Sequence, residues 1–295
     1  MQTSTLKIAT AAMILMFIAV IAFRVTRSED CSSSTHTTLI LIDKTDPLSS
    51  DALYAAKERI WKLIEEAPQF SQVIFREIVG NDTDGTARTP RTDSLCRGVR
   101  PDGAEGFKGK AQVIREKWRV FQNEVCGSAP ETDVGALACN DPKRKKDGIL
   151  DRAEKSSQTS PILESVADSA RQYLTTKDQS WTLVILSDWR QYGGPVDLHT
   201  RPCNLAAMPN YQSVPALAQK DKKTLSVSGE PTRSSRVISL FALRSTMANS
   251  EADCLERFSE GFLLAQIEGG TLYKGETPRV LPPETYRLPR SLGVN

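Results

Sequence analysis

Two apolar runs of this sequence end in aspartate and hydroxyl residues, whose oxygens suit a hard divalent cation. Residues 38–42 lead into Asp43, Thr45 and Asp46, and residues 181–186 lead into Ser187 and Asp188. Carboxylate and hydroxyl oxygens are the ligands that Mg²⁺ and Ca²⁺ select, with no histidine or cysteine required. The two segments therefore predict an oxygen-rich ion site, for Mg²⁺ or else Ca²⁺ or Mn²⁺.

The two runs are also the strands that must bring these side chains together. Neither run alternates apolar with polar residues, which is typical of strands buried on both faces in a parallel sheet. Ligands of open α/β sheets bind at the carboxyl ends of the strands. A third loop offers the hydroxyl of Thr159, with Ser157 and Ser160 as alternatives, just before a predicted helix. We expect the ion to be held by Asp43, Thr45, Thr159 and Asp188, with Asp46 and Ser187 as additional ligands.

Two alternatives stay open for these segments. Aspartate commonly ends strands and caps helices, so Asp43 and Asp188 have a purely structural role as their other interpretation. Trp189, Arg190 and Tyr192 follow the second aspartate, and residues of these types are common at protein interfaces. They are predicted either to form a partner-binding rim or to pack under the long loop that follows.

The order of elements predicts an α/β fold, with a doubly wound, mostly parallel central sheet and helices on both faces. Strands are expected at residues 38–42, 71–79, 181–186, 236–242 and 271–273, and helices at 51–66, 108–125, 161–175 and 252–268. One domain would span residues 37–275, with long loops at 80–107, 126–160 and 189–235. Residues 28–36 would be a linker, and residues 276–295 a Pro-rich, extended tail.

This arrangement resembles a von Willebrand factor A domain over about residues 37–274. That family places Asp-x-Ser-x-Ser after its first strand, a Thr in a middle loop and an Asp after a later strand, which together form a metal-ion-dependent adhesion site. Asp43 and Thr45 match the first two positions, Thr159 the middle loop and Asp188 the last. Pro47 replaces the second Ser of the first motif, which removes one hydroxyl ligand, while Asp46 adds a carboxylate.

The resemblance implies a binding module in which a divalent ion grips an acidic side chain of a partner protein. A scaffold with a dead ion site is the first alternative, because Pro47 interrupts the motif. The second is a Mg²⁺-dependent phosphatase with Asp43 as nucleophile, similar to the haloacid-dehalogenase-like enzymes. Those enzymes place an Asp two residues later, where this chain has Thr45. The non-enzymatic interpretation is therefore preferred.

The N-terminus predicts attachment to a membrane. Residues 8–23 carry no charge, Lys7 precedes them, and Arg24 and Arg27 follow. A transmembrane helix needs about 20 apolar residues, and a snorkelling arginine extends this run into that range. Residues 1–27 are therefore predicted to be a signal anchor, with a cleaved signal peptide as the alternative.

Composition and cysteine usage narrow the compartment and the partners. Lys and Arg number 38 against 36 Asp and Glu, so the net charge of +2 gives no field that favours nucleic acid. With two histidines, a His-rich metal site is excluded. Six cysteines without CxxC spacing indicate disulfides in an oxidising compartment, although their pairing stays open. We expect a single-pass membrane protein whose domain is periplasmic or extracellular.

Overall fold

The computed structural model describes residues 31, 34–82, 84–104, 110–130, 137–152, 157–174, 180–192, 197–198, 203, 236–244, 246–268 and 284–289. The apolar run at residues 8–23 lies outside this part of the chain. Among the described residues, no helix has the length and apolar character needed to cross a membrane. The predicted strand at 271–273 and His199 also lie outside it.

Six strands of the described chain form one sheet in the order β3-β2-β1-β4-β5-β6. Their bounds are β1 His36–Asp43, β2 Ser71–Ile78, β3 Thr92–Arg97, β4 Ser180–Ser187, β5 Arg236–Ala242 and β6 Glu284–Leu288. All neighbours pair in parallel except β3, which runs antiparallel to β2 at one edge. The prediction of a mixed α/β fold with a mostly parallel sheet is confirmed.

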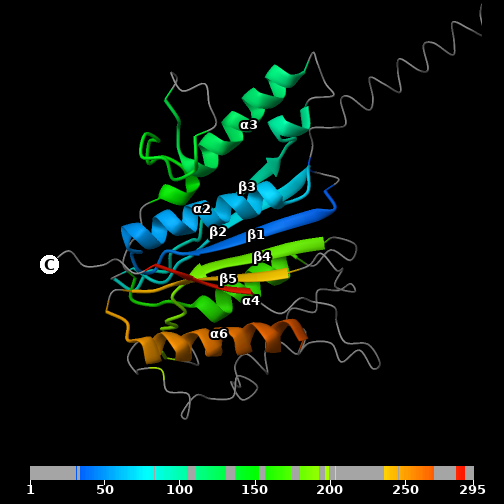
Figure 1. Cartoon of the computed structure of the whole chain (residues 1–295). Coiled ribbons are helices and arrows are strands. Elements are labelled where there is room, and N and C mark those ends of the chain that lie inside the picture. Colours follow the sequence, from blue (N-terminus) through cyan, green and yellow to red (C-terminus); the bar gives the residue numbers. More distant parts are fainter. Residues whose placement is uncertain are drawn as a thin grey trace, which may run out of the picture.

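Helices cover both faces of this sheet (Figure 1). Helices α2 (Ser50–Glu66) and α3 (Ala111–Cys126) lie on one side, and α4 (Ile162–Tyr173) and α6 (Asn249–Glu268) lie on the other. Short 3₁₀ helices occur at Pro101–Ala104 and Ile149–Asp151. Each face has its own apolar core, and alternate residues of β1 supply the two cores: Ile40 and Ile42 face α2, while Leu39 and Leu41 face α4 and α6.

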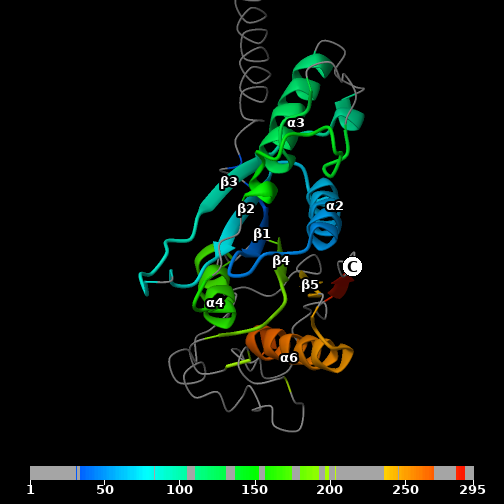
Figure 2. The ribbon, with the colours of Figure 1, turned by 90° about the vertical axis from the view of Figure 1, so that its left-hand side faces the viewer.

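The central strand β1 is buried along its whole length, as its unbroken apolar run predicts. It pairs with β2 on one side and β4 on the other, and Ile42 lies opposite Leu186 in the register with β4. The parallel strands β1 and β4 therefore end side by side. Figure 2 looks onto the edge of the sheet at which they end.

The segment expected to be an extended tail contributes the edge strand β6. Residues Glu284–Leu288 pair in parallel with β5, and Leu288 is buried in the core on the α2 side. The ring of Tyr286 lies under the guanidinium of Arg59 from α2, 4.0 Å from its carbon to the ring centroid. The sequence did not predict this strand, because it is only five residues long and lies in a Pro-rich segment.

All six cysteines form disulfides, which confirms the expectation from their number. Cys31 pairs with Cys96, Cys126 with Cys139, and Cys203 with Cys254. The first bond joins the segment just before β1 to the edge strand β3. The second closes a loop at the end of α3, and the third anchors Cys203 to α6.

Candidate functional site

Asp43 is the centre of a hydrogen-bonded cluster at the carboxyl edge of the sheet. It ends β1 and is 5% exposed. One carboxylate oxygen accepts hydrogen bonds from the backbone N–H of Thr45 at 3.0 Å and from the Thr45 hydroxyl at 2.6 Å. The other oxygen accepts from the hydroxyl of Ser187, at the end of β4, at 2.7 Å. Asp43 thus joins the ends of the two central strands.

Burial leaves the charge of this carboxylate poorly compensated. Loss of solvent, and after it the nearby carboxylate of Asp188, together raise the pKa of Asp43 to about 6, although the hydrogen bonds from Thr45 and Ser187 oppose the shift. The pKa of Asp188 is raised as well, chiefly by its burial, while the positive charge of Arg244 opposes that shift. Two buried carboxylates at one strand edge favour a cation between or beside them.

Ser160 supplies the middle-loop hydroxyl of the cluster. Its Oγ lies 2.9 Å from Oγ1 of Thr45. Because the Thr45 hydroxyl donates its hydrogen to Asp43, the Ser160 hydroxyl is the donor in this contact. The expected residue, Thr159, has another position: its Oγ1 accepts from the backbone N–H of Asn81 at 2.9 Å. Of the two adjacent hydroxyls, the one that contacts Thr45 is therefore that of Ser160.

Glycine is required where the middle loop meets the loop after β2. A Cβ built on Gly80 would lie 1.7 Å from the carbonyl oxygen of Thr159, so no other residue fits. Ser157 lies in the same region. Its backbone N–H donates to the carbonyl of Thr45 at 3.1 Å, and its hydroxyl donates to the carbonyl of Asn81 at 2.8 Å. These bonds hold the middle loop against the ends of β1 and β2.

The middle loop is also tied to the segment after β4. Ser160 and Tyr192 exchange two backbone hydrogen bonds, of 2.8 and 3.1 Å. Next to Tyr192 in the chain, the buried side chain of Gln191 accepts from the backbone N–H of Leu163 at 3.0 Å and so satisfies one N–H in the first turn of α4. The loops after β1, after β2 and after β4 are therefore connected to the segment that opens α4.

Arg244 completes the cluster and was not among the residues expected there. It lies just beyond β5, and its guanidinium pairs with Asp46 through Nη2 and with Asp188 through Nε. Asp188 is 5% exposed, and its other oxygen accepts from the backbone N–H of Arg190 at 3.0 Å. The position of Arg244, two residues past the strand predicted at 236–242, was the available signal, because that strand ends at the same edge.

Trp189 is a core residue, so of its two expected positions it does not take the one in a partner-binding rim. Its side chain is fully buried, its Nε1 donates to the hydroxyl of Ser239 at 3.0 Å, and its ring meets Phe262 edge-on at 6.1 Å between centroids. The backbone there has φ 59°, a left-handed conformation that costs a non-glycine residue about 1 kcal/mol. The tight turn aims Asp188 at the cluster while the indole anchors the loop.

The other two residues of the expected rim are half-buried. The guanidinium of Arg190 pairs with Glu251 at the start of α6, at 2.8 Å, and is 16% exposed. Tyr192 makes the backbone pair with Ser160 described above. Arg190 and Tyr192 lie beside the cluster and are partly exposed. Because Trp189 is buried, a partner would contact two of the three expected side chains at most.

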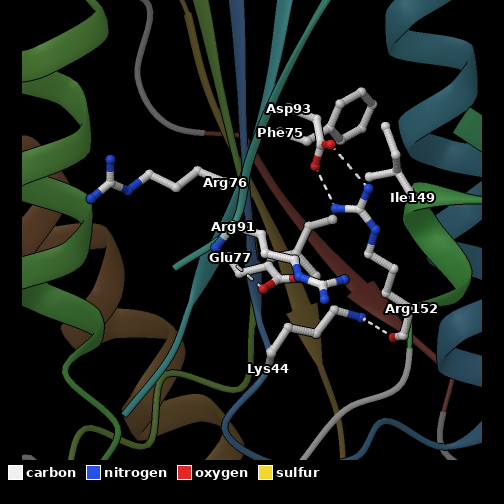
Figure 3. Close-up of a pocket in the computed structure, with 9 residues that line it drawn as sticks. Lys44, Phe75, Arg76, Glu77, Arg91, Asp93, Ile149 and Arg152 are labelled. Carbon is white, nitrogen blue, oxygen red and sulfur yellow. Dashed lines mark hydrogen bonds and ion pairs between the residues drawn. The ribbon is translucent and has the colours of Figure 1, made fainter. Parts of the chain in front are cut away.

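A small cavity lies on the α2 side of the same strand ends (Figure 3). It measures about 10 Å³, the size of one water molecule. The Nζ of Lys44 points into this region and donates to the carbonyl of Arg152 at 2.9 Å, and Arg152 forks onto Asp93. Arg76 points away, toward α4. The Arg152–Asp93 ion pair and the bond from Lys44 to Arg152 therefore link the end of β1 to the segment after the Ile149–Asp151 turn, beside a cavity that has room for one water molecule.

The donor types of the cluster fit a hard divalent cation. Carboxylates of Asp43 and Asp188 and hydroxyls of Thr45 and Ser160 converge from three loops, and each is an oxygen donor that Mg²⁺ or Ca²⁺ accepts. Within the described residues, no three histidine, cysteine or acidic side chains group closely enough to hold a metal alone. An ion at this edge would therefore depend on the hydroxyls and on water as well as the two carboxylates.

Neither a family model nor a curated protein matches this chain. The geometry of the strand edge is thus the basis for any functional conclusion.

Proposed function

We propose that the chain is a membrane-tethered, von Willebrand factor A-like protein-binding module. The observation that carries this proposal is the meeting of Asp43, Thr45, Ser160 and Asp188 at the carboxyl edge of the sheet. The doubly wound order of the six strands, with β1 and β4 at its centre, is the framework that such a module needs.

In this proposal a divalent ion, Mg²⁺ or else Ca²⁺ or Mn²⁺, is held by the hydroxyls of Thr45 and Ser160 with Asp43 and Asp188 beside it. The bound ion supplies a strong positive charge with a coordination position open to an acidic side chain of the partner protein. Asp43 accepts a hydrogen bond from Ser187 and another from the Thr45 hydroxyl, and in this way it orients that hydroxyl. Trp189 keeps Asp188 directed at the same point.

Residues 8–23 and the disulfides support the location. An apolar run flanked by Lys7 and Arg24 is suited to anchor the chain, and cleavage as a signal peptide is the alternative. Three disulfides favour an oxidising compartment, so the domain would be periplasmic or extracellular. A partner on that side of a membrane, and not nucleic acid, fits the near-neutral net charge.

A second candidate function is a binding scaffold that works without an ion. The contact of Arg244 with Asp188 and Asp46 favours it, because the protein itself supplies a positive charge to those carboxylates. The exposed Pro47 adds no hydroxyl to the cluster. In that case a partner would bind the same edge of the sheet, and divalent ions would have no effect.

Thermal unfolding of the purified full chain distinguishes the two. The protein is measured in EDTA and then with Mg²⁺, Ca²⁺ or Mn²⁺, because binding to the native state stabilises it by about 2.7 kcal/mol at a hundredfold excess over Kd. A rise of several degrees that disappears in Asp43→Asn supports the ion-dependent module. The matched control is Asp102→Asn, an exposed aspartate after β3. No shift with any ion would favour the scaffold.

A further inference from the structure

We propose that Arg244 is a built-in competitor for the divalent ion, so that the ion enters the site only when this side chain moves away. The inference rests on the proposed function, because it concerns the ion affinity of the same cluster. It assigns a role to Arg244, which carries a positive charge and cannot itself be a ligand of the ion.

The contacts of Arg244 are those that an ion would need. Its Nε lies against Asp188, one of the two buried carboxylates, and its Nη2 lies against Asp46, a carboxylate of the loop that carries Thr45. A guanidinium in this position joins the loop after β1 to the loop after β4. A divalent ion held by Thr45 and Asp188 would join the same two loops, so the two cations share a ligand.

Charge makes the two cations exclusive. A guanidinium and a divalent ion that both touch Asp188 would lie within a few ångströms of each other, in a site where Asp43 and Asp188 are each 5% exposed. Like charges repel strongly at such distances in a poorly solvated site. Arg244 therefore opposes the ion by repulsion as well as by occupying a ligand.

The side chain has room to leave. Arg244 is 25% exposed and Asp46 is 26% exposed, so the outer part of this ion pair faces solvent, where an ion pair is held weakly. The contact with Asp188 is the buried half. A partner carboxylate at the rim would attract the guanidinium outward and so favour entry of the ion beneath it.

Binding of Mn²⁺ to the full chain tests the inference. Binding is measured by electron paramagnetic resonance, in which the signal of the free ion decreases as the ion binds. When a competitor closes a site, the apparent affinity falls by the fraction of molecules that are open. We expect Arg244→Gln to lower the Kd for Mn²⁺ tenfold or more relative to the unmodified chain. Asp43→Asn added to Arg244→Gln should abolish that gain, which locates the ion in this cluster.

Two further variants guard the interpretation. Arg287→Gln removes an arginine of β6 that also pairs with two carboxylates, those of Asp253 and Glu256 on α6, and with none of the cluster, so its Kd should change less than twofold. Arg244→Lys keeps one positive charge but lacks the planar fork, so it should give an intermediate Kd. If Arg244→Gln fails to fold by circular dichroism, Arg244→Lys decides alone, because it too must bind Mn²⁺ more tightly.

The outcomes separate the two proposals. Tighter binding in Arg244→Gln supports the inference, and if the unmodified chain then binds no Mn²⁺ at all, Arg244 closes the site completely until it is displaced. Equal or weaker binding in Arg244→Gln overturns the inference but leaves an ion-dependent module standing. Absence of binding in every variant overturns both the competitor and the ion site.

Discussion

The hydroxyls of Thr45 and Ser160 lie 2.9 Å apart, although 115 residues separate them in the chain. Thr45 follows the central strand β1, and Ser160 precedes α4. Their contact exists because the segment around Ser160 is bonded on one side to Thr45 and Asn81 and on the other to Tyr192. The two hydroxyls therefore meet only when the whole domain is folded, since they belong to two different loops.

Ser160→Ala and Thr159→Val form a matched pair of variants for the middle loop. Each removes one hydroxyl and each should cost about 1 kcal/mol of unfolding free energy, because each hydroxyl makes one hydrogen bond. If the ion site is as proposed, only Ser160→Ala should also lose the thermal shift caused by Mg²⁺ or Mn²⁺. Loss of the shift in Thr159→Val alone would return the middle position to Thr159.

Trp189 should be essential for stability rather than for surface recognition. Trp189→Ala empties a fully buried site and should lower the unfolding free energy by about 3–5 kcal/mol, measured by urea denaturation. Trp189→Phe should cost less, about 1–3 kcal/mol, since it leaves the hydroxyl of Ser239 without its indole partner. A change below 0.5 kcal/mol for either variant, roughly the size typical of surface substitutions, would contradict the buried position.

His36 should make the protein sensitive to mild acid. Its ring is buried, with Nδ1 2.7 Å from the hydroxyl of Ser180, and burial lowers its pKa to about 4, with a smaller contribution from the charge of Arg236. The unfolded chain, with an ordinary histidine pKa of about 6.5, then binds the proton more readily. Stability from this group is complete above pH 6.5 and is lost as the pH falls toward 4, by about 3 kcal/mol in total.

The measurement is the urea midpoint between pH 7 and pH 4 for the unmodified chain and for His36→Asn. Carboxylates that titrate in the same range affect both proteins alike, so the difference between the two isolates the histidine. We expect the gap between them to close as the pH falls. A gap that does not depend on pH would show that His36 keeps an ordinary pKa.

The disulfide between Cys31 and Cys96 should stabilise the protein more than the disulfide between Cys126 and Cys139. It spans 65 residues, against 13 for the bond between Cys126 and Cys139. A longer loop loses more entropy when it is closed in the unfolded chain, which predicts stabilisation of about 4 kcal/mol against about 3 kcal/mol. Paired Cys→Ser variants of each bond, compared by thermal unfolding, check the order, and the reverse order would contradict it.

Much of the framework was accessible to sequence reasoning because it depends on local pattern. An unbroken apolar run such as residues 38–42 is typical of a strand covered on both faces, and the aspartate after such a strand lies at its end. The same argument placed Asp43, Ser187 and Asp188 at one edge of the sheet. The strand β6 escaped this argument because five residues with partly exposed side chains give too weak a pattern.

What only the tertiary structure decided was which neighbour in a loop makes each contact. Thr159 and Ser160 have equivalent chemistry, and the backbone pairing with Tyr192 is what turns Ser160 toward Thr45. Similarly, a tryptophan after a strand is equally suited to a surface or a core, and the left-handed turn at Trp189 sends it inward. Arg244 reaches Asp188 because β5 pairs beside β4. Sequence patterns report the average environment of an element, whereas loop contacts depend on the direction of single side chains, which long-range packing sets.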